Sequence, residues 1–197
     1  MRTIIKYTKY LINYFVSFSI DISDFFFRDV RSRIGGAKYY RESKLYPGYL
    51  KQGNMSEAVK WLAQIYCRGK GVDIGSGRWP LQGARAIEDN NEENAYRIKE
   101  QDGALDFVFS SHLLEHLSKW EDALREWHRT LRRGGVIFLY LPHPVCAMWK
   151  PGVNLQHVWT PDPQKVSNFL TGTMGMCLKK ITYLPDGYLG FLIVAEK

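Results

Sequence analysis

The sequence has few cysteines, and these are not arranged for cross-linking or for binding metal. Cys67, Cys146 and Cys177 are scattered and odd in number, and none has the short paired spacing of a structural zinc site. Disulfide frameworks belong to oxidising compartments. We therefore expect three reduced thiols and a cytoplasmic protein.

Long apolar runs are also missing. A transmembrane helix needs about 20 mostly apolar residues, whereas Asn13, Asp21 and Asp24 interrupt the N-terminal apolar stretch. This stretch begins with basic residues, but no small-x-small cleavage pattern of a signal peptide follows it. The sequence thus predicts neither a membrane span nor a cleaved leader.

The N-terminal stretch has helical periodicity instead, because apolar positions 4, 7, 11, 14, 15 and 18 fall on one face. We expect residues 1–54 to form a helical, aromatic-rich extension and residues 55–197 to form one α/β domain. The preferred interpretation packs the extension on that domain as a cap. A peripheral membrane or partner contact through residues 1–27 stays open as the alternative.

Positive charge is not concentrated on the main domain. The formal net charge is +7, and residues 1–50 hold nine Lys or Arg residues against four Asp or Glu residues. Most of the excess therefore lies in the extension. Because the rest of the chain is nearly balanced, we expect no nucleic-acid groove across the domain.

A short apolar strand running into two glycines is the first motif that points to a ligand. It reads Gly71-Val72-Asp73-Ile74-Gly75-Ser76-Gly77, and no Gly-Lys-Ser/Thr tail of a phosphate-binding loop follows. Gly75 and Gly77 let the backbone bend and let a ligand approach without meeting a Cβ. Asp73 disfavours a phosphate in this place and suits a ligand that carries an ammonium group.

A strand–helix–strand pattern follows in the centre of the chain. Residues 104–111 read as a buried strand, residues 112–117 as the start of an amphipathic helix, and residues 123–135 as a helix closed by glycines. Another buried strand, 136–142, comes next. This spacing predicts a right-handed crossover in a parallel sheet. Near the C-terminus, residues 178–184 and 190–195 are predicted to pair as an antiparallel hairpin.

Three ordered motifs resemble the class I S-adenosylmethionine (SAM) dependent methyltransferases, specifically the type 11 group. They are Val72-Asp73-Ile74-Gly75-Ser76-Gly77, then Leu105 to Ser111 with Leu114-Glu115-His116-Leu117, and finally Leu131-Arg132-Arg133-Gly134-Gly135. The resemblance covers residues 71–145 well. It implies a Rossmann-like sheet, mostly parallel with an antiparallel C-terminal hairpin, SAM as cofactor, and methyl transfer to a small-molecule or saccharide-type acceptor. The alternative is a degenerate methyltransferase fold that acts as a non-catalytic binding partner.

The sequence departs from the family after Gly77. A third glycine is absent, and Pro80 forbids a regular helix here, which predicts a compact first half with residues 84–87 as the second strand. The resemblance places Glu88 on the ribose hydroxyls, and Asn94 and Ala95 near the adenine. The full set of implied cofactor-binding residues is Asp73, Gly75, Ser76, Gly77, Glu88, Asn94, Ala95 and Ser110.

His112 and His143 are the candidate catalytic residues, because each follows a buried strand on the rim of the predicted sheet. Imidazole is a suitable base for a hydroxyl near neutral pH, which slightly favours O-methylation over N-methylation. The resembling ubiquinone O-methyltransferases are thought to hold a divalent cation with a Glu-x-x-Glu-His trio, whose first position is His112 here. The preferred interpretation of His116 is a hydrogen-bonded helix histidine, and no metal ligands are predicted.

Overall fold

The computed structural model describes residues 57–77, 80–90, 92–146, 149–186 and 190–197. All of them belong to one compact unit, residues 49–197. The extension predicted for residues 1–54, with its contact surface at 1–27, lies outside the described residues. Within the described residues, no helix has the length and apolar character that a membrane crossing requires.

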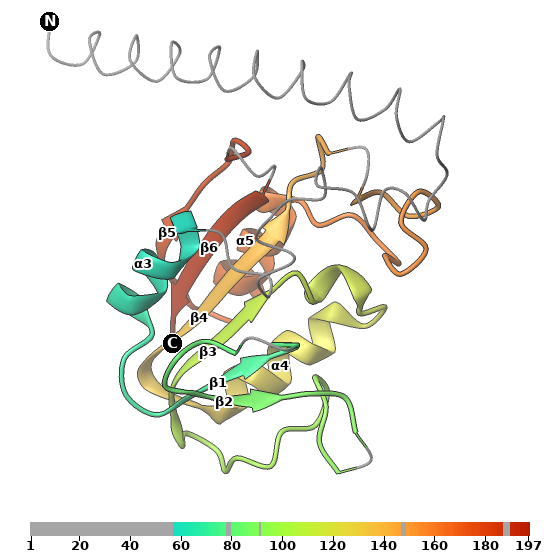
Figure 1. Ribbon diagram of the computed structural model, residues 1–197. Helices are drawn as coiled ribbons and strands as arrows, with labels where there is room; N and C mark the ends of the chain where they lie inside the picture. The colour runs from blue at the N-terminus through green and yellow to red at the C-terminus, as the bar shows by residue number, and fades with distance from the viewer. Residues whose placement is uncertain (1–56, 78–79, 91, 147–148, 187–189) are drawn as a thin grey trace, which may run out of the picture. The chain divides into compact units, whose positions relative to one another are not determined.

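The described residues form a six-stranded sheet with the order β2-β1-β3-β4-β6-β5 (Figure 1). The strands are β1 (Gly71–Ile74), β2 (Ala84–Ile87), β3 (Leu105–Ser111), β4 (Leu131–Pro142), β5 (Cys177–Ile181) and β6 (Gly190–Glu196). The first four pair in parallel, whereas β6 runs antiparallel to both β4 and β5. The Rossmann-like fold with an antiparallel C-terminal hairpin is therefore confirmed.

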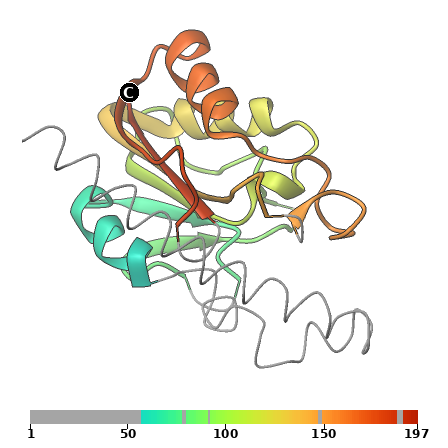
Figure 2. The same cartoon turned by 90° about the horizontal axis from the view of Figure 1, so that it is seen from above.

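Helices cover both faces of the sheet. Helix α3 (Glu57–Tyr66) lies on one face, and α4 (Trp120–Thr130) and α5 (Pro163–Asn168) lie on the other (Figure 2). Side chains alternate along a strand, so Phe107 and Phe109 of β3 pack with the residues of α3, and Val108 packs with those of α4. Burial on both faces explains why β3 is an almost continuous apolar run.

The link between β1 and β2 has no helix among its described residues. Parallel neighbours usually need a crossover of a dozen or more residues, but here only residues 75–83 connect the two strands. The backbone N–H of Leu81 donates to Oδ2 of Asp73 over 2.7 Å, and the Leu81 side chain is buried. This bond folds the link back onto the sheet, which confirms the compact first half and the helix-breaking role of Pro80.

The segment between β3 and β4 differs from the expected helices. Residues 112–117 contain only a single 3-10 turn, η1 (Leu114–His116), and α4 ends at Thr130. The predicted helix over 123–135 was therefore too long, because β4 already begins at Leu131. Gly135 lies within β4 at a position with little room for a side chain, because a Cβ there would lie 3.0–3.1 Å from three backbone carbonyl oxygens.

Helix α5 (Pro163–Asn168) begins two residues after the Thr-Pro pair at 160–161. Asp162 is its N-cap and accepts a hydrogen bond from the backbone N–H of Lys165, with Pro163 in the first turn. A short π-helix, η3 (Phe169–Thr173), continues it.

The three cysteines are free, as predicted, and burial raises the pKa of the Cys67 thiol.

Candidate cofactor and acceptor site

The predicted site residues meet along one edge of the sheet. The glycine loop follows β1, Glu88 follows β2, His112 follows β3 and His143 follows β4. Because these four strands are parallel, their carboxyl ends share an edge. In open α/β sheets this edge is where ligands bind.

The glycine loop has the backbone conformation that its sequence suggests. Gly75 and Gly77 have φ values of +74° and +59°, in the left-handed region that favours glycine. A Cβ added at Gly77 would meet no atom within 4 Å, so the loop leaves open space beside its backbone there. Ser76, between them, is buried.

Glu88 closes onto this loop from the end of β2. Its Oε1 atom accepts hydrogen bonds from Oγ of Ser76 at 2.6 Å and from the backbone N–H of Gly77 at 2.7 Å. Glu88 itself is exposed. The structure thus places the predicted ribose-binding carboxylate against the glycine loop, with its second oxygen still available for a ligand hydroxyl.

Asp73 is a buried acid in need of a positive partner. Its side chain is 2% exposed. The pKa of Asp73 is raised to about 7, mainly by burial and also by the charge of Glu88, while the hydrogen bond from the backbone N–H of Leu81 acts in the opposite direction. An ammonium group bound between the two acids would relieve both the desolvation and the repulsion.

Three of the implied cofactor residues make internal bonds. The amide oxygen of Asn94 accepts from the backbone N–H of Tyr96, and the carbonyl of Ala95 accepts from Nε1 of Trp127 at 2.8 Å. Oγ of Ser110 donates to the carbonyl of Ile74 and joins β3 to β1. Their cofactor contacts stay predictions, and each residue has a structural role besides.

His112 and Glu115 form a buried pair at the end of β3. Nδ1 of His112 lies 3.3 Å from Oε1 of Glu115, and their side chains are 5% and 0% exposed. Burial favours the neutral acid, but the neighbouring His112 and His116 hold the pKa of Glu115 below its ordinary value. The carboxylate is therefore ionised beside the His112 ring.

The backbone of His112 is in an unusual conformation. It has a φ of +53°, the one positive φ of a non-glycine residue in the described ranges, and its N–H donates to the carbonyl of Tyr140. Left-handed conformations of such residues cluster at functional sites, because they persist only where the surroundings enforce them. The helix predicted to begin at residue 112 is therefore absent there, although the side chains of His112 and Glu115 do meet.

His143 is held by the backbone at both ring nitrogens. Its Nε2 donates to the carbonyl of Tyr183 at 3.1 Å, and its Nδ1 accepts from the backbone N–H of Val145 at 3.2 Å. A ring bonded in this way braces the loop after β4. Its predicted catalytic role stays a prediction, and the geometry favours His112 as the base.

Sequence reasoning missed the contribution of a distant loop. His157 is buried, its Nε2 lies 3.8 Å from Oε1 of Glu115, and its ring is 4.7 Å from that of His116. Trp149 stacks on His157 and also contacts His112. No local pattern in the sequence indicated the contact between His157 and Glu115.

Comparisons with known proteins point to a methyltransferase domain. A family model described as a methyltransferase domain matches residues 53–139, which include the glycine loop, Glu88 and the β3–α4–β4 crossover. The fold and the matched domain indicate a SAM-dependent methyltransferase, which favours the enzyme over the non-catalytic alternative. Within that class, the matched segment is similar to the methyltransferase domains of the type 11 group.

Solved methyltransferase structures share the fold at low identity. A SAM-dependent methyltransferase of Thermotoga maritima, described as a possible histamine N-methyltransferase, is 13% identical with a TM-score of 0.54, over 81% of this chain and 98% of that chain. The Burkholderia thailandensis 1,6-didemethyltoxoflavin-N1-methyltransferase, solved with that substrate and S-adenosylhomocysteine, is 15% identical with a TM-score of 0.55, over 85% and 87%. No curated protein matches the chain.

The residues present fit the SAM cofactor. SAM carries a sulfonium and an ammonium group, and the loop edge offers two carboxylates whose charges repel one another. The open space at Gly77 gives the ligand access to the backbone. The donor set therefore suits a cationic amino-acid group joined to a ribose.

Proposed function

We propose that the chain methylates an oxygen atom of a small-molecule or saccharide-type acceptor, with His112 as the general base. The observation that carries this proposal is the His112–Glu115 pair at the carboxyl end of β3, with 3.3 Å between Nδ1 and Oε1. A hydroxyl must lose its proton as it attacks, whereas a neutral amine needs no base for the attack itself. A buried imidazole oriented by a carboxylate therefore favours oxygen as the acceptor.

SAM supplies an electrophilic methyl group, and the protein holds it in place. Asp73 attracts the ammonium group, the Gly75–Gly77 loop supports the amino-acid portion, and Glu88 accepts hydrogen bonds from the ribose hydroxyls. Holding acceptor and methyl in line can contribute about 7–11 kcal/mol to lowering the barrier in well-oriented systems. Positioning is thus the main contribution of these residues.

His112 is suited to take the acceptor proton. An imidazole whose Nδ1–H faces the Glu115 carboxylate carries its lone pair on Nε2. The side chain is nearly buried and lies between the rings of Tyr140 and Trp149, with centroid distances of 5.5 and 5.6 Å. Water is largely excluded around such a base, and its orientation is defined by the packing.

The test is methyl transfer by the purified full-length chain from SAM with a labelled methyl group. Candidate acceptors are nucleotide sugars, free monosaccharides, phenols and biogenic amines, and the product is identified by mass spectrometry and NMR. We expect a methoxy product whose formation is strongly reduced in His112→Asn. An N-methylated product, or an unchanged rate of methyl transfer in His112→Asn, would contradict the proposal.

A further inference from the structure

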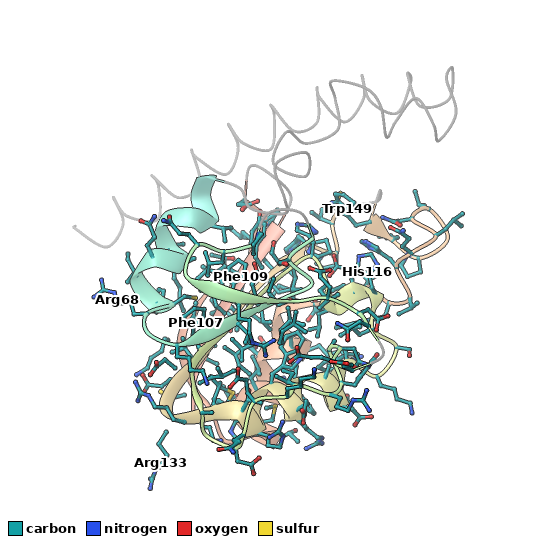
Figure 3. All side chains as sticks on the ribbon, turned by 60° about the horizontal axis from the view of Figure 1, so that its bottom comes forward. Arg68, Phe107, Phe109, His116, Arg133 and Trp149 are labelled. Atoms are coloured by element: carbon teal, nitrogen blue, oxygen red, sulfur yellow. The ribbon has the colours of Figure 1, made fainter. Side chains whose placement is uncertain are left out.

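Two histidines near the rim have no part in the proposed reaction. Glu115, His116 and His157 each offer a candidate ligand atom, and these atoms lie within 4.8 Å of one another. Glu115 and His157 are buried and His116 is half-buried. Figure 3 shows His116 and Trp149, whose carbonyl contacts His157, on the same side of the fold.

The Glu115 carboxylate is only partly compensated by its neighbours. Its side chain is fully buried, and within the described residues neither oxygen has a full hydrogen bond. Nδ1 of His112 approaches Oε1 at 3.3 Å, but one imidazole proton cannot satisfy both oxygens. Because incomplete pairing of a buried carboxylate is costly, a bound cation would stabilise this group further.

The two histidines are oriented as metal ligands are. Nδ1 of His116 lies 2.9 Å from the carbonyl of Gln156, and Nδ1 of His157 lies 2.5 Å from the carbonyl of Trp149. A carbonyl oxygen only accepts, so both Nδ1 atoms carry a proton, and each ring in its neutral form then has its lone pair on Nε2. Metal-bound histidines are usually fixed by this same bond from the opposite nitrogen.

We propose that Glu115, His116 and His157 bind one divalent first-row transition-metal ion. Two imidazole nitrogens and a carboxylate form a three-ligand set that suits zinc or iron and leaves a coordination position open, whereas magnesium and calcium prefer oxygen ligands alone. Bonds of about 2.0–2.2 Å require the three ligand atoms to move closer together than their present separations of up to 4.8 Å. The set differs from the linear trio considered from the sequence, because His157 supplies a ligand from a distant loop.

The proposal is tested with Co²⁺ as a spectroscopic probe. The full-length chain is dialysed against a chelator and titrated with Co²⁺, and the visible d–d absorption is followed. We expect saturation at one equivalent, with displacement by Zn²⁺. Glu115→Gln and His157→Ala should each weaken Co²⁺ binding by at least about tenfold, while His128→Ala, a histidine of α4 outside the cluster, should stay within about twofold.

A second measurement guards against variants that fail to fold. Zn²⁺ should raise the thermal midpoint of the wild type and of His128→Ala but not of Glu115→Gln, which keeps the volume of the side chain. Absence of a saturable Co²⁺ signal, or equal affinity in all variants, overturns the proposal. Metal binding does not rest on the choice of acceptor: a chain that binds Co²⁺ but methylates no oxygen keeps the metal site and rejects the proposed function.

Discussion

Nε2 of His157 lies 3.8 Å from Oε1 of Glu115, so the loop after β4 completes a cluster that begins at the end of β3. Burial lowers the pKa of His157, although the charge of Glu115 acts in the opposite direction. His157 is therefore neutral at physiological pH, while Glu115 is ionised.

Glu88→Gln should weaken SAM binding by at least about tenfold. The variant loses the charge that strengthens hydrogen bonds to ribose hydroxyls and to Ser76, and bonds to charged groups contribute about 1.5–3 kcal/mol. Calorimetric titration with SAM measures the change. Glu92→Gln, an exposed acid paired with Lys99, is the matched control and should bind SAM like the wild type.

Asp73→Asn should change how stability depends on pH. The pKa of Asp73 is raised to about 7 in the folded protein, so the folded state holds a proton that the unfolded chain releases at lower pH. The contribution of this proton to the free energy of unfolding is fully present below the ordinary pKa of an aspartate, and it is lost as the pH rises through about 7. Relative to wild type, the variant should therefore gain stability between pH 5 and pH 8. Guanidinium unfolding at both values tests this, and a constant difference would refute it; Asp89→Asn is the exposed control.

His112→Asn should fold and lose activity. Asparagine tolerates the left-handed φ of this position better than most residues, and removing a general base typically costs about 10²–10⁴ in rate. By contrast, His143→Gln should keep most of the rate and lose about 1–2 kcal/mol of stability through its two backbone bonds. Rate assays and denaturant unfolding compare the two variants. A larger loss of rate in His143→Gln would assign the base to His143 instead.

Gly71→Ala should destabilise the domain by about 1–3 kcal/mol, the cost typical of overpacking. Gly71 pairs with Phe107 in the sheet, and a Cβ at Gly71 would lie 2.4 Å from that ring. Gly172→Ala is the matched control, because a Cβ there meets nothing within 4 Å. Chemical denaturation with both variants should show a change only for Gly71→Ala.

Local patterns in the sequence were sufficient for most of the fold. The second strand, 84–87, has the predicted bounds because Pro80 excludes a helix before it and Glu88 ends its short run. The C-terminal hairpin follows from two apolar segments flanking a turn. These features depend on neighbouring residues, and such patterns are visible in a single sequence.

The site was less predictable, because its decisive contacts are distant in the chain. The positive φ of His112 comes with a backbone bond to Tyr140 of the next strand, which no helical spacing at 112–116 could indicate. Likewise, the sequence around His143 does not indicate its hydrogen bond to the carbonyl of Tyr183, which lies 40 residues away. The tertiary structure, rather than residue type, decides which histidine can accept a proton.

The loop over residues 149–159 is fastened to the η1 turn. The N–H of Val158 donates to the carbonyl of Glu115, Nε1 of Trp159 donates to that of Leu114, and His157 is bonded to Trp149. Adapting this loop to a bulkier acceptor would therefore break several hydrogen bonds. For the proposed acceptor site, this rigidity predicts selection by shape among acceptors that differ by a single substituent.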